Sequence, residues 1–189
     1  MRRLFLLLVV AAAVTAPAVA APANAKCALH NPASYSATPP PLPALTGRVV
    51  DNAHILSATE RRRLTLQLAA LERQTTDQLV VVTLPSLGGY SIEQVGLRLG
   101  KGWRIGQSGL DNGVLLIVAP NDHQVRIEVG CGLEGLLTDK RAGEIIQRKL
   151  IPLLRTGGYD RAAESGATAI AAILDADPRR PQPRRGDGT

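Results

Sequence analysis

Two nearly continuous apolar runs constrain the fold of this chain more than any other feature. QLVVVTL occupies residues 78–84, and GVLLIVA occupies residues 113–119. Runs of this kind, rich in β-branched residues, are typical of strands buried on both faces, because a half-exposed strand would alternate apolar and polar side chains. A third segment, QVRIEVG (124–130), does alternate, so we expect it to be half exposed. The chain must therefore supply cover for both faces of a sheet.

Helical segments alternate with these strands and can supply that cover. The helix signals are capping boxes at Ser57-x-x-Glu60 and Ser91-x-x-Gln94, and two segments near residues 139–154 and 159–175. Helices interleaved with a mostly buried sheet favour an α/β sandwich. Asn121-Asp122 supplies a turn between the second and third strands, so these two strands form a hairpin and the sheet is mixed.

The N-terminus has the pattern of a secretory signal peptide. Arg2 and Arg3 precede an apolar run, and small-x-small sites allow cleavage after residue 20 or residue 25. We therefore expect an exported protein, periplasmic or secreted, with residues 1–25 removed. No second apolar span follows, so we expect no transmembrane segment in the mature chain.

The remaining length is predicted to hold one domain with a flexible segment on each side. Residues 26–45 are proline-rich and predict an extended tether. Residues 46–175 predict a single domain, and residues 176–189 predict a disordered basic tail.

Charge and aromatic content argue against a nucleic-acid partner. The formal net charge is +6, but residues 45–175 hold 15 Lys and Arg against 14 Asp and Glu. A nucleic-acid surface needs clustered basic residues, with aromatic residues where the strand is single. This chain has one Phe, one Trp and three Tyr. The basic excess lies in the tails rather than in the domain.

The hairpin places several polar residues at one end of the sheet. If Ala119 pairs near Gln124, then Gly113 lies opposite Gly130. Asp111 and Asn112 then emerge beside the segment 131–134, which contains Cys131 and Glu134. The sequence therefore predicts a polar rim around the glycine-rich stretch VGCGLEGLLTD (129–139).

Five residues are candidate ligands for a cation at this rim. If the segment VVDNA (49–53) ends at the same edge, the set is Asp51, Asp111, Asn112, Glu134 and Asp139. Carboxylate and amide oxygens suit a hard cation, Ca²⁺ or Mg²⁺, whereas zinc would require His or Cys clusters. A purely structural interpretation stays open: Asp-Asn-Gly is a common turn, Asp139 can cap a helix, and Glu134 can be a solvated surface residue.

Several enzyme classes lack their motifs in this chain. A cysteine phosphatase loop needs Arg six positions after its cysteine, and that position after Cys131 is Leu137. The chain has no G-x-S-x-G nucleophile elbow and no Walker loop. A hydrolase built on this sequence would have to use metal-activated water.

The chain resembles the TPM domain family. The segments that carry the resemblance are GRVVDNAHILSATERRRL, DQLVVVTLPSLGGYSIE, GWRIGQSGLDNGVLLIVAPND, VRIEVGCGLEGLLTD and GGYDRA, which together cover nearly all of residues 46–174. The resemblance implies a single three-layer α/β/α sandwich with an acidic, Ca²⁺-binding end, and weak acid phosphatase activity in some members. Its motifs match Asp51, Asp111, Asn112, Glu134 and Asp139. Cys131 departs from the pattern, because the family usually has tyrosine there.

Two functions and one disulfide stay open at this point. The first function is divalent-cation binding with weak metal-dependent hydrolysis of a small phosphoester. The second is a non-catalytic module for a cell-envelope protein. Cys27 and Cys131 are the two cysteines, and export would allow a bridge between them; the alternative is that Cys131 is a small buried filler and Cys27 a free thiol.

Overall fold

A computed structural model of the chain describes residues 41–178. The predicted signal peptide, most of the predicted tether and most of the predicted tail lie outside these residues. Within residues 41–178, no helix is both long enough and apolar enough to cross a membrane.

Four strands of the described chain form one mixed sheet in the order β1-β2-β3-β4. They are β1 (Val49–Asp51), β2 (Gln78–Thr83), β3 (Gly113–Ala119) and β4 (Gln124–Val129). The first three strands are parallel, and β4 runs antiparallel to β3. Ala119 pairs with Gln124, and the Gly130 amide donates to the Gly113 carbonyl at 2.7 Å, so the predicted hairpin register is confirmed.

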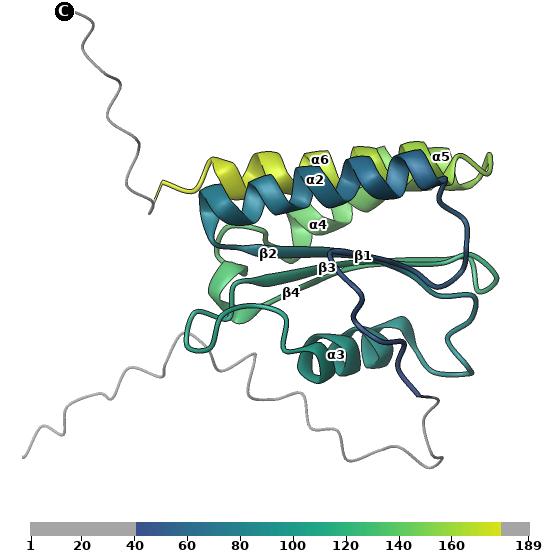
Figure 1. The fold of residues 1–189 in the computed structure, drawn as a ribbon, viewed down its shortest axis with the longest axis horizontal. Helices are drawn as coiled ribbons and strands as arrows, with labels where there is room; N and C mark the ends of the chain where they lie inside the picture. Colours follow the sequence, from purple (N-terminus) through teal and green to yellow (C-terminus); the bar gives the residue numbers. More distant parts are fainter. Residues whose placement is uncertain (1–40, 179–189) are drawn as a thin grey trace, which may run out of the picture. The chain divides into compact units, whose positions relative to one another are not determined.

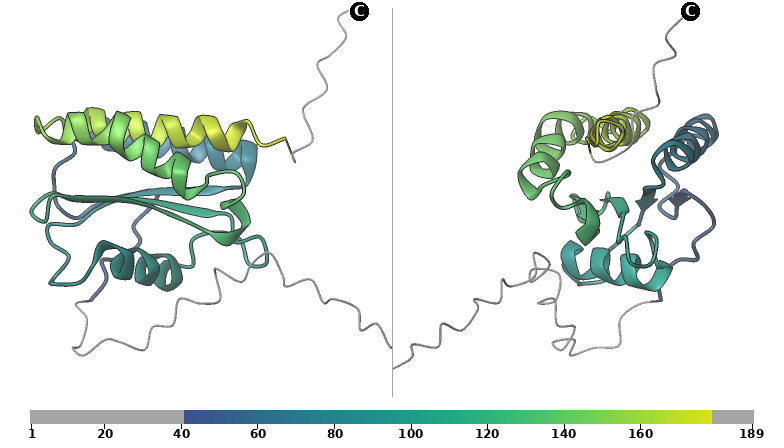
Figure 2. Two further views of the ribbon diagram at one scale, coloured as in Figure 1. Left: turned by 180° about the vertical axis from the view of Figure 1, so that it is seen from behind. Right: turned by 90° about the vertical axis from the view of Figure 1, so that its left-hand side faces the viewer.

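Helices cover both faces of this sheet (Figures 1 and 2). One face carries α2 (Ala58–Thr75), α4 (Asp139–Ile145), α5 (Ile151–Leu154) and α6 (Tyr159–Asp175), and the other carries α3 (Ile92–Trp103). Successive β2 residues face the two cores in turn: Val81 joins the core under α2 and α6, and Val82 joins the core over α3. The predicted three-layer α/β/α sandwich is confirmed.

The two parallel crossovers place their helices on opposite faces. The chain steps from β1 to β2 and from β2 to β3 in the same direction across the sheet, yet α2 and α3 lie on different sides. Two crossovers of this kind have opposite hands, so one of them is left-handed, against the strong preference for right-handed connections. No local sequence signal predicts this.

The predicted capping boxes have different outcomes. At α3, the Ser91 side chain accepts from the Gln94 amide and the Gln94 side chain accepts from the Ser91 amide, so the box is complete. At α2, the Ser57 hydroxyl accepts from the Glu60 amide at 3.1 Å, but the Ser57 amide donates to Asp160 at 2.8 Å instead of to Glu60. The second half of that box is therefore a link between α2 and α6.

The helix predicted over residues 139–154 is interrupted. A π-helix, η2 (Ile146–Leu150), separates α4 from α5. Pro152 gives the physical reason, because it has no N–H to donate to the preceding turn and its ring crowds that turn. A wider turn before the proline accommodates both effects.

The described end of the predicted tether packs on the domain. Leu42 lies against the core over α3, and the Trp103 indole N–H donates to the Pro43 carbonyl at 2.9 Å. The domain therefore begins before the predicted boundary at residue 46. At the other end, Asp177 is buried, so ordered packing continues past residue 175.

Candidate functional site

The glycine-rich stretch packs backbone on backbone against the loop before β3. A Cβ on Gly132 would lie 1.8 Å from the Leu110 carbonyl oxygen, and a Cβ on Gly130 would lie 2.1 Å from the Asp111 carbonyl oxygen. The Gly132 amide donates to the Asp111 carbonyl at 3.1 Å. Only glycine fits such contacts. We call this region, residues 105–113 and 130–139, the loop end of the sheet.

Asn112 holds the loop end together from inside. It is 5% exposed. Its side-chain amide donates to the Thr76 carbonyl at 2.9 Å and to Asp77 at 3.1 Å, and its side-chain oxygen accepts from the Gln107 amide at 2.8 Å. These bonds use both ends of the Asn112 amide, so its predicted role as a cation ligand is not supported by its geometry.

Three carboxylates of the predicted set do belong to the loop end. Asp111 is exposed and has a left-handed backbone with φ +47°. Asp139 is exposed at the first residue of α4, where Thr138 rather than Asp139 provides the N-cap, and Glu134 is half-buried. Among residues 41–178, no three His, Cys, Asp or Glu side chains are grouped so that they could hold a metal ion.

Asp51 lies at the other end of the sheet, which corrects the expected convergence. The register aligns Asp51 with Thr83, and Thr83 with Val118. Val118 is five residues along β3 from Gly113, roughly 17 Å at the usual rise of a strand. The three strands β1 to β3 are parallel, so their carboxyl ends share one edge while Asp111 precedes β3 at the opposite edge. A single cation therefore cannot contact both Asp51 and Asp111.

The Asp51 carboxylate instead holds the chain between β1 and α2. Its side chain is 2% exposed. One oxygen accepts from the Thr83 hydroxyl at 2.6 Å and the Ile55 amide at 3.1 Å. The other accepts from the Leu56 amide and the Arg61 guanidinium, each at 3.2 Å. All four donors belong to the protein, so this carboxylate has a structural role.

Cys131 is half-buried and begins the 3₁₀ turn η1 (Cys131–Leu133). Cys27 lies outside the described residues, so its pairing with Cys131 stays a prediction.

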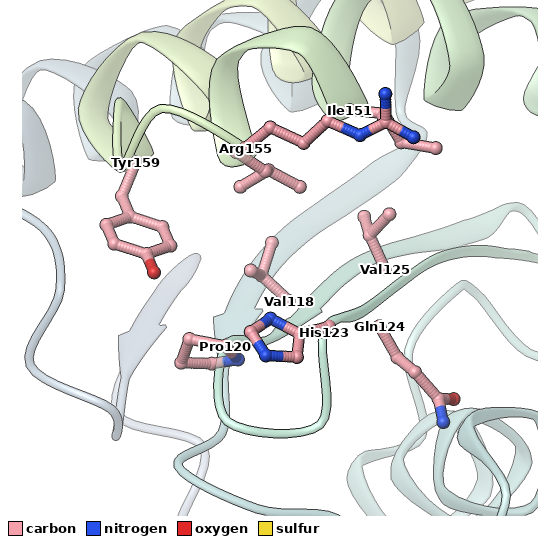
Figure 3. A pocket seen from close by; sticks show the side chains of 9 residues that line it. Val118, Pro120, His123, Gln124, Val125, Ile151, Arg155 and Tyr159 are labelled. Atoms are coloured by element: carbon pink, nitrogen blue, oxygen red, sulfur yellow. The ribbon is translucent and has the colours of Figure 1, made fainter.

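A pocket of about 410 Å³ opens at the end of the sheet opposite the loop end. We call it the hairpin-end pocket, because it lies where β3 turns into β4 (Figure 3). Its lining residues are Val118, Pro120, His123, Gln124, Val125, Ile151, Leu154, Arg155 and Tyr159. No sequence motif predicts this pocket, because its lining comes from segments that share none. Pro152 marks an irregular helix beside the pocket, but by itself it does not indicate a pocket.

Glu60 and Glu93, among the described residues, have shifted pKa values, and neither lines the pocket. Burial raises the pKa of Glu60 above its ordinary value of 4.5; Arg63 opposes this shift and Asp160 adds to it. One Glu60 oxygen has no hydrogen-bond partner within the described chain. A hydrogen bond from its own backbone N–H lowers the pKa of Glu93. Burial opposes this shift, and smaller contributions from Ser91 and Arg126 lower the pKa further.

The chain forms a small α/β/α domain. Its sheet has a glycine-packed loop end and, at the opposite end, an apolar pocket. The family model described as TPM domain matches residues 49–173. The chain belongs to the TPM domain family.

Solved structures agree with this assignment. The N-terminal domain of a protein from P. gingivalis is 35% identical, with a TM-score of 0.64 over 69% of this chain and 83% of that chain. The N-terminal domain of the cg2496 protein from Corynebacterium glutamicum is 15% identical, with a TM-score of 0.55 over 82% and 99%. The BA42 protein from Bizionia argentinensis is 18% identical, with a TM-score of 0.55 over 63% and 81%; the last two show the fold alone. No curated protein matches the chain.

Proposed function

We propose that this chain is an exported TPM-domain protein whose domain is a non-catalytic interaction module for a protein partner in the cell envelope. One observation carries the proposal: Asp51 and Asn112 are used as internal hydrogen-bond partners, and Asp51 and Asp111 lie at opposite ends of the sheet. A hydrolase with metal-activated water needs carboxylates that converge on the ion. The separation of these residues favours binding over catalysis.

The loop end is the surface we propose for the partner. Its backbone contacts hold it rigid, and Leu110 is 54% exposed beside the exposed carboxylate of Asp111. A rigid surface loses little conformational entropy on binding, which favours affinity. Export is supported by the signal-peptide pattern of residues 1–25.

A divalent cation at the loop end is a second candidate function. It is favoured by the exposed carboxylates of Asp111 and Asp139 on adjoining segments. Ca²⁺ takes 6 to 8 oxygen ligands, which commonly include main-chain carbonyls and water, so two carboxylates from Asp111, Glu134 and Asp139 would suffice. This reduced ligand set leaves out Asp51 and Asn112.

A phosphomonoesterase assay with and without Ca²⁺ or Mg²⁺ tests the non-catalytic assignment. The proteins to compare are the wild type, Asp111→Asn and, as a matched exposed control, Asp175→Asn. We expect no turnover above the buffer in any of them. Cation-dependent turnover that is lost in Asp111→Asn and retained in Asp175→Asn would show that the domain is an enzyme rather than a non-catalytic module.

Site-specific photo-crosslinking in cells tests the proposed surface. A crosslinking residue at Leu110 should give one adduct of defined size. The same residue at Leu66, which is 67% exposed on α2, should give none. Equal labelling from both positions, or no adduct from position 110, would contradict the assignment of the loop end.

A further inference from the structure

The hairpin-end pocket has an aliphatic body. Five of its nine lining residues are Val118, Pro120, Val125, Ile151 and Leu154. Its volume of about 410 Å³ falls within the usual range for small-molecule sites. It also lies at the carboxyl ends of the parallel strands, where open α/β sheets commonly bind ligands.

Three side chains from different elements give this aliphatic body a polar edge. His123 comes from the β3–β4 turn, Arg155 follows α5, and Tyr159 begins α6. In Figure 3 the Tyr159 hydroxyl points from its helix toward the turn that carries His123, whereas the Arg155 guanidinium extends along the helical side toward Ile151, away from Tyr159. No hydrogen bond or ion pair found within residues 41–178 involves any of these three side chains. Their hydrogen-bonding capacity is therefore available to a ligand.

The interrupted helix forms one wall of the pocket. The π-helix η2 ends at Leu150, and the residues that line the pocket follow it directly as Ile151, Leu154 and Arg155. Single π-helical turns inside α-helices occur frequently at functional sites. The wider turn changes which side chains of the following helix face the sheet, so the irregularity and the pocket are parts of one feature.

The charge of the polar edge indicates the sign of the ligand. None of the nine lining residues is acidic, whereas Arg155 always carries a positive charge. A guanidinium binds the planar oxygens of a carboxylate or a phosphate through paired hydrogen bonds. We propose that the hairpin-end pocket binds a small molecule with an aliphatic body and one anionic head group, a carboxylate or a phosphate, held by Arg155. This site is independent of the module function proposed for the loop end.

Titration of the full chain with decanoate and with decyl phosphate, followed by amide NMR, tests this proposal. At least one of the two anions should give saturable shifts confined to residues 118–125 and 151–160, and the tighter one identifies the head group. Decanol and decyltrimethylammonium, which keep the chain length and change the charge, should bind about tenfold more weakly.

Variants assign the binding to named side chains. Arg155→Gln should weaken binding about tenfold, whereas Tyr159→Phe, which keeps the ring packed and removes a hydroxyl that points away from Arg155, should change it by less than Arg155→Gln does. Arg148→Gln, an exposed change outside the pocket, should leave the affinity within about twofold of the wild type. The proposal is wrong if neither anion saturates, if decanol binds as tightly, if the shifts lie elsewhere, or if Arg155→Gln binds like the wild type.

Discussion

Replacement of Asp51 by asparagine separates a structural carboxylate from a cation ligand. The oxygen of the new side-chain amide can still accept from the Thr83 hydroxyl and the Ile55 amide, which now bond to one carboxylate oxygen. The second oxygen becomes an NH₂ group, so it faces the Leu56 N–H and the Arg61 guanidinium as a third donor. The substitution thus keeps the shape of the side chain and removes one buried acceptor.

The cost follows from those two lost bonds. A buried N–H left without an acceptor costs about 1–3 kcal/mol. The ion pair adds at most about 1 kcal/mol, because the Arg61 side chain is 42% exposed. We therefore expect Asp51→Asn to lower the free energy of unfolding by about 3 kcal/mol, which corresponds to a loss of roughly 10 °C in Tm for a domain of this size.

Thermal and urea unfolding in EDTA measure this cost. Asp111→Asn is the matched control: its side chain is exposed, and asparagine tolerates a left-handed backbone, so its change should stay below about 0.5 kcal/mol. An Asp51→Asn protein as stable as the wild type in EDTA would refute the structural role. So would a difference between them that appears only when Ca²⁺ is added.

Three further predictions follow from packing and titration. Gly132→Ala should cost more than about 4 kcal/mol in urea unfolding, because the new Cβ overlaps a carbonyl oxygen, whereas Gly135→Ala, with no atom within 4 Å of its Cβ, should be nearly neutral; equal costs would contradict the close approach. Leu42→Ala should cost about 1–2 kcal/mol because Leu42 is partly buried, and no loss would show that residues 41–45 do not pack on the domain. Burial raises the pKa of Glu60 in the folded state, so ionised Glu60 costs stability as pH rises above 4.5. Glu60→Gln should therefore be more stable than the wild type at pH 7, with the advantage disappearing below pH 4.5; a constant difference across that range would contradict this reasoning.

The layered fold follows from sequence patterns that act over short distances. The runs at 78–84 and 113–119 are apolar at nearly every position, so they had to be covered on both faces. The turn at residues 121–122 then fixed the hairpin register, and with it the proximity of Asp111 to Gly130. These features depend on side-chain periodicity and turn chemistry, which a single sequence displays directly.

The position of Asp51 could not be predicted in the same way. A short apolar run ending in a carboxylate is compatible with either direction of β1, and strand direction depends on how α2 crosses the sheet. Parallel pairing with β2 sends Asp51 to the edge opposite Asp111. The hairpin-end pocket escaped prediction for a similar reason, since its walls meet only through the tertiary fold. The π-helix before Pro152 depends on a balance between proline geometry and packing that no short motif records.

Titration of the chain with Ca²⁺, followed by amide NMR at every assigned residue, tests most directly whether the two ends of the sheet are separate. Saturable shifts should be confined to the loop end, residues 105–113 and 130–139. The amides of Ile55 and Leu56, which bond to Asp51, should not move. Joint saturation of the Ile55, Leu56 and Asp111 amides at one Ca²⁺ concentration would contradict the separation of the two ends. The absence of any saturable shift would rule out the proposed Ca²⁺ site at the loop end.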